Sequence, residues 1–399
     1  MVARHGRELA ELLPEWRRLA SLNGGVFGMP AIALPWWEHL GRGKLHVVAA
    51  RRDGRLVALV PLHERRLAGR TVLRWLGHGL GIVGEVMHEP GEVDGLDGIW
   101  ERLADSTSVL ELTSFRQGGA GLQELRRAPG LQTRLVVSGL CPIIELNGAA
   151  SLADWLRGRP GLAKSLRRLD KGLDTASVDF EAEVVTSAAR VRALFPQLRA
   201  VSNAAEAALP RLDLFAPPHQ SFAETMLQET ALAGQLLLVA GWFDGDLGAF
   251  DIGLQCGSTV YDIYGRYDPR LARHSPGTLV QREIVRAAIA MPVERVDLQL
   301  GDHPYKRRWA DSYYDAVDVL AGPAGGMRRA ATWQSPSWPP MGHGRRCARA
   351  CRGAGEHEAG CRAGRAGDLP GAEADAATAH HRARLVHPFP RARVRDGCR

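Results

Sequence analysis

One segment of the sequence is repeated later in the chain. Residues 45–58 read LHVVAARRDGRLVA, residues 236–249 read LLLVAGWFDGDLGA, and the two segments align without a gap. In each, two apolar runs are joined by Asp-Gly, which is the strongest short-range signal for a β-hairpin. Two hairpins in the same register predict a duplicated domain, because a repeated sequence unit marks a repeated structural unit.

The segments around the two hairpins also correspond. Apolar residues at helical spacing precede the first hairpin, and residues 188–203 and 219–233 are predicted helices before the second. The strand-like run VLELTSF at 109–115 corresponds to ERVDLQL at 294–300. We therefore expect a mixed α/β fold with two tandem domains, residues 1–150 and 151–325, since 399 residues are enough for two cores.

The second domain has the clearer pattern. It predicts, in order, strand 178–185, the two helices, hairpin 235–255, strand 258–266, helix 276–290, strand 293–299, a short helix near 303–310 and strand 313–320. The basic stretch 154–174 joins the two domains. Its side chains are expected either on the outer face of a connecting helix or against an acidic substrate, and they are Lys164, Arg167, Arg168 and Lys171.

Residues 326–399 differ in composition from the rest of the chain. This tail holds 14 Arg, no Lys and 6 Asp or Glu, a net charge of +8, which leaves 37 basic and 38 acidic residues in the remainder. Because the tail has almost no Val, Ile, Leu or Phe, it cannot bury enough apolar surface to fold. We interpret it as an unstructured extension or as out-of-frame translation. The nearly neutral remainder gives no reason to expect nucleic-acid binding.

Cysteine usage and hydropathy are typical of a cytoplasmic protein. Four of the six cysteines lie in the tail, at a spacing that matches no usual zinc site, so no metal is predicted. Cys141 and Cys256 are expected to be buried free thiols. The sequence has no run of about 18–20 apolar residues and no signal-peptide core. We therefore expect a cytoplasmic protein without a membrane span.

The start of the predicted helix 276–290 reads RHSPGT. Ser275 is a suitable N-cap and Pro276 a suitable first residue, with Gly277 and Thr278 in the first turn. Free backbone N–H groups and a partial positive charge at such a helix start suit a pyrophosphate, and Arg273 is available beside it. Taken alone, the segment also fits an ordinary helix that begins with proline.

The predicted strand 293–299 carries polar residues where apolar ones are expected. Asp297 and Gln299 share one face, and a central strand covered by helices should be apolar on both faces. Either a ligand or an opening lies beside these residues, or the strand is exposed on that face. After Gly301, Lys306 beside Tyr305 could bind an anionic group or the oxyanion of an acyl transfer, or could belong to a solvated basic face.

Two tyrosines, Tyr261 and Tyr264, lie on the predicted strand 258–266, and Asp262 points to the opposite face from Tyr261. A tyrosine hydroxyl here could protonate a departing thiolate, and Tyr264 is included among the candidate catalytic residues. Packing across neighbouring strands is an equally good interpretation.

The order of elements in the second half resembles the GNAT acyltransferase superfamily, as do the residues RYDPRLARHSPGTLVQREIV and VDLQLGDHPYKRRWA. The chain looks most like the cellulose-biosynthesis acetyltransferase-like branch, akin to the tandem-domain Fem-type peptidyl transferases. The resemblance is strongest over about 160–320. It implies an acyl-CoA cofactor between strands 258–266 and 293–299, with Lys306 near the acyl centre. Where relatives commonly show Asp-Tyr, the first half reads GIVGEVMHEP, which does not support a substrate contact from the first domain.

Together these features favour an acyl-CoA-dependent N-acyltransferase, with acetyl-CoA or another acyl-CoA as donor. The expected acceptor is a small-molecule or sugar amine, and the resemblance implies a role in polysaccharide or cell-envelope biosynthesis. Two alternatives remain: a Fem-like transferase that uses aminoacyl-tRNA, and a non-catalytic binding module of a polysaccharide-synthesis system. Asp297, directly or through a water, is the expected base. The other candidate residues are Lys306, Tyr305 and Tyr264 for catalysis, and Arg273, Ser275, Gly277 and Thr278 for the cofactor.

Overall fold

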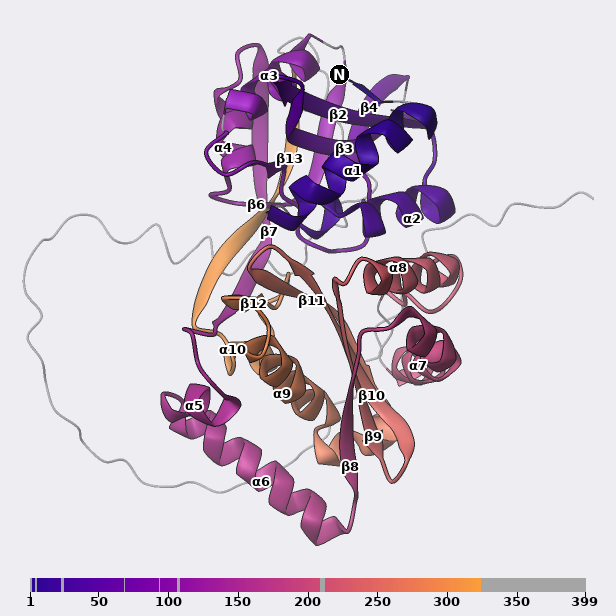
Figure 1. The fold of residues 1–399 in the computed structure, drawn as a ribbon, viewed down its shortest axis with the longest axis vertical. Coiled ribbons are helices and arrows are strands. Elements are labelled where there is room, and N and C mark those ends of the chain that lie inside the picture. The colour runs from indigo at the N-terminus through magenta and orange to yellow at the C-terminus, as the bar shows by residue number, and fades with distance from the viewer. Residues whose placement is uncertain are drawn as a thin grey trace, which may run out of the picture. The chain divides into compact units, whose positions relative to one another are not determined.

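The structure is a computed structural model that describes residues 2–3, 6–22, 25–67, 69–92, 94–105, 108–208 and 212–323 (Figure 1). The tail, residues 326–399, lies outside these residues, so both interpretations of it stay predictions. The described part has the mixed α/β fold that the sequence predicts.

The first half starts with helices and continues into the first hairpin. The face of α1 that contains Leu12, Trp16 and Leu19 is fully buried, as the helical spacing predicts. The elements of this half are β1 (Val2–Ala3), α1 (Gly6–Leu22), η1 (Val26–Gly28), α2 (Pro30–Leu40), β2 (Lys44–Arg52), β3 (Arg55–Leu67), β4 (Arg70–Trp75), β5 (Met87–His88), α3 (Asp94–Ala104), β6 (Val109–Arg116), α4 (Ala120–Arg127) and β7 (Leu131–Glu145).

The second half contains every element that the sequence predicts, with one strand shorter than expected. The predicted strand 293–299 ends at Asp297, because Gln299 takes a left-handed conformation with φ of 58°. The elements are α5 (Leu152–Arg157), α6 (Pro160–Ala176), β8 (Phe180–Val185), α7 (Ala188–Ala208), α8 (Gln220–Leu232), β9 (Leu236–Phe243), β10 (Asp246–Cys256), β11 (Thr259–Tyr267), η2 (Pro269–His274), α9 (Pro276–Ile289), β12 (Arg295–Asp297), α10 (Pro304–Arg307) and β13 (Ser312–Pro323).

Both repeated segments form the predicted hairpins. The turn between β2 and β3 has φ of 50° at Asp53 and 80° at Gly54, and the turn between β9 and β10 has φ of 53° at Asp244 and 84° at Gly245. Two successive positive φ angles are the mark of a type I′ turn, which follows the natural twist of the strands. The duplicated sequence therefore produces a duplicated local structure.

The sheet is continuous across the two halves. Its strands follow the order β1-β2-β3-β4-β6-β13-β7-β12-β11-β10-β9-β8, and β5 pairs with β3. β7, from the first half, pairs with β12, while β13, from the end of the second half, pairs with β6. β7 and β13 also pair with each other along their length, as the long antiparallel ribbon in Figure 1 shows. Each half thus supplies a strand to the sheet of the other.

Helices cover both faces of the second half of the sheet (Figure 1). On one face, α9 packs Leu279 and Ile284 against Val239 and Val260. On the other face, α7 and α8 pack against strands β9 to β11, with Phe250 in the same apolar core. Among the described residues, no helix combines the length and the apolar character needed to cross a membrane.

β11 and β12 separate in the middle of this sheet. They pair in parallel only from Thr259↔Arg295 to Tyr261↔Asp297, and β11 then continues to Tyr267 without β12 beside it. On its other side, β11 has a bulge at Ile263, because Ile252 pairs with Tyr264 and Gly253 with Asp262. Bulges re-aim side chains and are common beside functional sites. The separation leaves the N–H and C=O groups of one edge of β11 facing the gap.

Candidate active site

A cavity of about 310 Å³ lies where β11 and β12 separate, and we call it the splay cavity. One wall is formed by β10 and β11, another by the first turn of α9, and Tyr305 of α10 lies at its border. The lining residues are Phe250, Asp251, Asp262, Gly265, Arg266, Tyr267, Ala272, Ser275, Pro276, Gly277, Thr278, Val280, Gln281 and Tyr305.

The first turn of α9 faces the splay cavity, as the sequence predicts for Ser275, Gly277 and Thr278. Ser275 occupies the N-cap position in a left-handed conformation, with φ of 51°, and its side chain makes no capping hydrogen bond. The predicted N-cap position of Ser275 is confirmed, without the side-chain bond that usually accompanies it. Without that bond, the helix start keeps its partial positive charge available to a ligand. Arg273 is exposed outside the lining and donates from Nε to Nε2 of His274 at 2.8 Å.

Two carboxyl groups line the splay cavity, those of the buried Asp251 and the half-buried Asp262. Burial raises the pKa of both, and each also affects the other because they lie on the adjacent strands β10 and β11. Two carboxyl groups in contact favour a single shared proton over two negative charges. Oδ1 of Asp251 has no hydrogen-bond partner among the described residues. This part of the lining is thus a polar surface with spare hydrogen-bonding capacity.

Lys306 is buried and does not belong to a solvated basic face. Its Nζ donates to the carbonyl oxygen of Leu298 at 2.6 Å and to that of Leu300 at 3.1 Å. Burial lowers the pKa of Lys306, while the negative charges of Asp262 and other nearby groups act in the opposite direction. The ammonium group therefore supports the backbone that follows β12. Tyr305, in contrast, is 53% exposed and its ring stacks on that of His303.

A cluster of polar side chains lies on the face of β12 that points away from the splay cavity, where the two halves of the chain meet. We call it the seam cluster, and it consists of Glu85, Arg116, Tyr261, Asp297 and Tyr314. Asp297 is 0% exposed; it accepts hydrogen bonds from Tyr314 Oη at 2.7 Å and from the Gln299 N–H at 2.8 Å. Arg116 lies 3.7 Å from Oδ2 of Asp297, and its guanidinium group stacks 4.0 Å from the centre of the Tyr314 ring.

The interpretation of β12 as a strand exposed on its polar face is wrong. Asp297 is 0% exposed, because Tyr314 and Arg116 cover it. Gln299 is bound by the first half, since its Oε1 accepts a hydrogen bond from the Val83 N–H at 2.8 Å. Burial raises the pKa of Asp297, and the hydrogen bond from Tyr314 lowers it. In this geometry an acceptor amine has no accessible surface of Asp297 to approach.

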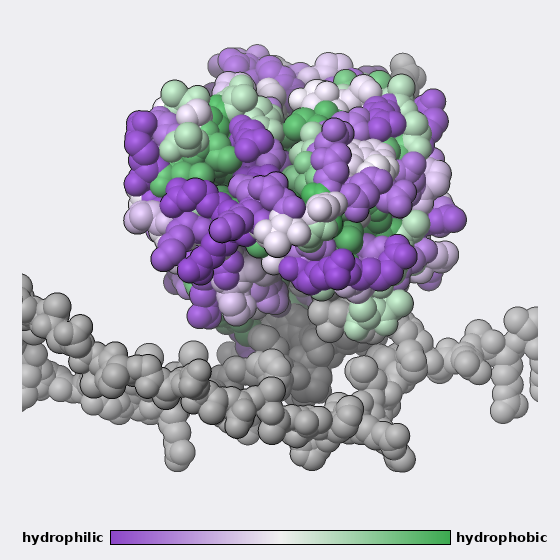
Figure 2. Space-filling view, turned by 90° about the horizontal axis from the view of Figure 1, so that it is seen from below, coloured by the Kyte–Doolittle hydropathy of each residue, from purple (hydrophilic) through white to green (hydrophobic). Residues whose placement is uncertain are grey.

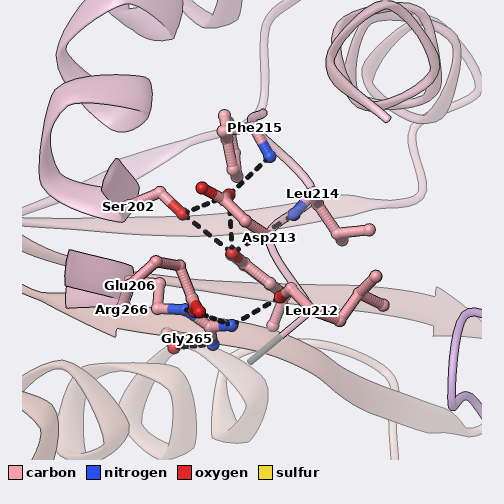
Figure 3. Close-up of polar contacts among 9 residues, drawn as sticks. Ser202, Glu206, Leu212, Asp213, Leu214, Phe215, Gly265 and Arg266 are labelled. Atoms are coloured by element: carbon pink, nitrogen blue, oxygen red, sulfur yellow. Dashed lines mark hydrogen bonds and ion pairs between the residues drawn. The ribbon is translucent and has the colours of Figure 1, made fainter. Parts of the chain in front are cut away.

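Tyr264 lies away from the splay cavity and the seam cluster, beside Ser202 of α7. Figure 3 shows the polar contacts of Ser202 and Asp213 in this region. Its hydroxyl group lies 2.8 Å from Ser202 Oγ and 3.2 Å from Asp213 Oδ1, and its ring packs against Phe215 and Phe250. The bulge at Ile263 explains this position, because it changes which face of the sheet the following residues occupy. The structure thus does not bring Tyr264 together with Asp297 or with the splay cavity.

The basic side chains of the connecting segment lie on the exposed face of helix α6. Lys164, Arg167, Arg168 and Lys171 are all exposed, in agreement with the connecting-helix interpretation. Figure 2 shows the molecule from below, with hydrophilic residues over most of this face and hydrophobic residues between them.

Several residues of the two sites could not be singled out from the sequence. Glu85, Arg116 and Tyr314 come together only because β6 and β13 pair with each other across the two halves. Asp251 could have been found from the sequence, because it is an acidic residue inside the apolar strand GAFDIG. A charge in the middle of a central strand indicates a polar partner or a ligand.

Comparison with known proteins agrees with this fold. Residues 161–307 match the family described as Acetyltransferase (GNAT) domain. The crystal structure of FemX has a TM-score of 0.58 at 10% identity and covers 83% of this chain and 100% of its own. The C-terminal domain of a proposed lysylphosphatidylglycerol synthetase from Agrobacterium fabrum has a TM-score of 0.52 at 14% identity, with coverage of 81% and 94%. A conserved protein of unknown function from Bacteroides thetaiotaomicron has a TM-score of 0.52 at 8% identity, with coverage of 80% and 99%. No curated protein matches the sequence significantly.

The family match covers the part of the chain that contains the separated strands β11 and β12 and helix α9. Residues 161–307 are therefore similar to the GNAT acetyltransferase domain, and the fold is similar to that of FemX, in line with the sequence resemblance.

Proposed function

We propose that the protein is an N-acyltransferase that takes its acyl group from acyl-CoA bound in the splay cavity. The observation that carries this proposal is the meeting of two features at one cavity: the free edge of β11 and the first turn of α9. The free edge offers backbone groups to an extended pantetheine arm, and the helix start offers N–H groups to a pyrophosphate. Ser275, Gly277 and Thr278 would contact the phosphates, with Arg273 near their outer end.

The proposed reaction is direct transfer between the two bound substrates. The free amine attacks the thioester carbonyl carbon, the C–N bond forms, the C–S bond breaks, and the thiolate takes up the proton that the nitrogen loses. Backbone N–H groups of β11 near the bulge would stabilise the oxyanion. Holding the two substrates together can itself lower the barrier by on the order of 7–11 kcal/mol. Asp297 and Lys306 act in this proposal by fixing the end of β12 and the corner beside the cavity.

The acceptor in this proposal is an amine on a small molecule or a sugar. The splay cavity is a site for the donor, so the acceptor would approach from the seam cluster, on the opposite face of β11 and β12. A role in polysaccharide or cell-envelope biosynthesis is part of the proposal, and it depends on the resemblance to the cellulose-biosynthesis acetyltransferase-like branch.

An aminoacyl-tRNA donor is the second candidate, and one observation favours it. The carboxyl groups of Asp251 and Asp262 would attract the free ammonium group of an aminoacyl ester more than a neutral acetyl group. The fold shared with FemX is compatible with either donor.

A comparison of donors tests the proposal. We expect thiol release from acetyl-CoA in the presence of hydroxylamine, a small and strongly nucleophilic amine, and no transfer of a labelled amino acid from aminoacyl-tRNA to the same acceptor. Transfer from aminoacyl-tRNA alone would support the second candidate. Binding of neither donor would leave the protein as a non-catalytic binding module and contradict both.

A further inference from the structure

The segment 82–86 of the first half is fixed against the end of β12. The Val83 N–H bonds to Gln299, two residues after Asp297, at 2.8 Å. Gly84 forms a parallel bridge with Phe115 of β6, in which the Gly84 N–H donates to Ser114 O at 2.9 Å and the Arg116 N–H donates to Gly84 O at 3.1 Å. The next residue, Glu85, is therefore held in the seam cluster by contacts on both sides.

The carboxyl group of Glu85 lies over the start of α4, in space made by two glycines. A Cβ atom at Gly119 would lie only 1.7 Å from Oε2 of Glu85, and one at Gly121 would lie 2.7 Å from Oε1. Oε1 accepts a hydrogen bond from the Val86 N–H at 3.0 Å, and the Gly121 N–H contributes a second bond to the carboxyl group. These bonds fix the orientation of the carboxyl group, and Glu85 as a whole residue is half-buried.

The charged and titratable groups around Glu85 come from four strands of the sheet. Arg116 ends β6, Tyr261 lies on β11, Asp297 ends β12, and Tyr314 lies on β13. Burial raises the pKa of Glu85 to about 7, although the bonds from Val86 and Gly121 and the charge of Arg116 act to lower it. A carboxyl group with a pKa near neutrality is suited to accept a proton at neutral pH. Asp297, by contrast, is 0% exposed.

Glu85 also lies on the side of the sheet from which an acceptor would enter. Successive residues of a strand point to opposite faces, and Asp262 of β11 lines the splay cavity. Tyr261, its neighbour, therefore points to the other face, where the charge of Glu85 is close enough to raise its pKa. The pairing of β11 with β12 ends at Tyr261, so the gap between these strands opens directly beside it.

We propose that Glu85, contributed by the first half of the chain, is the base that removes a proton from the acceptor amine. The ammonium group of the acceptor gives one proton to the Glu85 carboxylate, and the free amine attacks the donor carbonyl in the splay cavity. The C–S bond breaks, the leaving thiolate takes up the second proton that the attacking nitrogen loses, and Glu85 returns the first proton to solvent. Arg116 would hold the carboxylate in its charged form. This inference rests on the proposed function, and it reassigns the proton transfer that the sequence suggested for Asp297.

The test compares two acceptors with Glu85→Gln, which keeps an oxygen for the backbone bonds and removes the base. A lysine side chain in Nα-acetyl-lysine amide has a pKa of about 10.4 and must lose a proton before it reacts. Hydroxylamine is largely unprotonated at pH 7 and needs no base. We expect kcat/KM for the lysine acceptor to fall by about 10²- to 10⁴-fold, with little change for hydroxylamine. Acetyl-CoA affinity by calorimetry should stay the same.

The pH profile gives a second readout that a structural role would not affect. In the wild-type protein, kcat/KM for the lysine acceptor should fall as the pH drops through about 7, because Glu85 becomes protonated. The pH profile of Glu85→Gln should lack this fall in kcat/KM near pH 7. Glu124→Gln changes another buried acid of α4, which pairs with Arg127, and serves as the control that keeps the wild-type profile.

Three results would overturn the inference. Equal losses with both acceptors would indicate that Glu85 only stabilises α4. An unchanged rate with the lysine acceptor would indicate that another group is the base. If the wild-type protein does not bind acetyl-CoA at all, the proposed function fails, and the role of Glu85 fails with it.

Discussion

Replacing Lys306 with methionine should destabilise the protein rather than act on the reaction alone. Methionine has a length similar to that of lysine and replaces its aliphatic part, but it lacks the ammonium donor that bonds to Leu298 O at 2.6 Å and Leu300 O at 3.1 Å. A hydrogen bond from a charged group contributes about 1.5–3 kcal/mol to stability. Part of the sum over the two bonds offsets the free-energy cost of burying the ammonium group. We therefore expect the free energy of unfolding to fall by about 3 kcal/mol.

The loss of stability caused by Lys306→Met should also depend on pH. The positive charge of Lys306 lowers the pKa of Asp251 and Asp262, which burial raises. Without it, these two pKa values rise further in the folded state, so the folded protein holds more protons than the unfolded chain above about pH 4. Stability then falls as the pH rises through that window, because the folded state must lose those protons. The difference in the free energy of unfolding between variant and wild type should be larger at pH 8 than at pH 5.

Urea unfolding at the two pH values measures this effect, with Arg308→Met as the matched control. Arg308 is exposed at the end of the same short helix, so its replacement should change stability by less than about 0.5 kcal/mol. A Lys306→Met variant that is as stable as Arg308→Met, but transfers acyl groups slowly, would refute the structural role. It would instead support the role in oxyanion binding that the sequence suggested.

Two further substitutions separate structural from catalytic roles. Asp297→Asn leaves one side-chain oxygen for two donors, Tyr314 Oη and the Gln299 N–H, and removes the negative charge beside Arg116, so thermal unfolding should show a loss of about 1–3 kcal/mol while acetyl-CoA affinity stays the same; unchanged stability would contradict the bonding described here. Tyr264→Phe removes a hydroxyl group that bonds to Ser202, and it should cost about 1 kcal/mol of stability without slowing acyl transfer. A more than tenfold loss of rate would instead assign Tyr264 to the chemistry.

The local structure of the second half could be predicted well from the sequence. Asp-Gly turns, apolar alternation and the proline at the start of α9 depend on neighbouring residues, so the helices and strands follow from short-range patterns. The strand ending at Asp297 was predicted too long, since the left-handed conformation of Gln299 is stabilised by Val83 and Lys306 from elsewhere in the chain. A local pattern contains no information about such partners.

The seam cluster could not be predicted, because it depends on pairing between distant strands. β13 lies between β6 and β7 in the sheet, and this exchange brings Tyr314 close to Arg116. Because polar residues on a covered strand need partners, Asp297 was expected to face a ligand, an opening or solvent. It faces the first half instead. The residues of the splay cavity were easier to find, since Ser275, Gly277 and Thr278 are adjacent in the sequence.

Calorimetric titration of acetyl-CoA into the wild type, Gly277→Ala and Gly277→Asp tests the donor site most directly. A Cβ atom at Gly277 would lie 3.6 Å from the Tyr267 ring, an ordinary contact, so the alanine variant should fold and bind like the wild type. The aspartate is compatible with a helix start, but its charge about 4 Å from a phosphate would cost about 4 kcal/mol at an effective dielectric constant of about 20. We therefore predict a loss of affinity of about 10³-fold for Gly277→Asp alone. Equal affinity in the two variants, or no binding to the wild-type protein, would contradict an acyl-CoA site in the splay cavity.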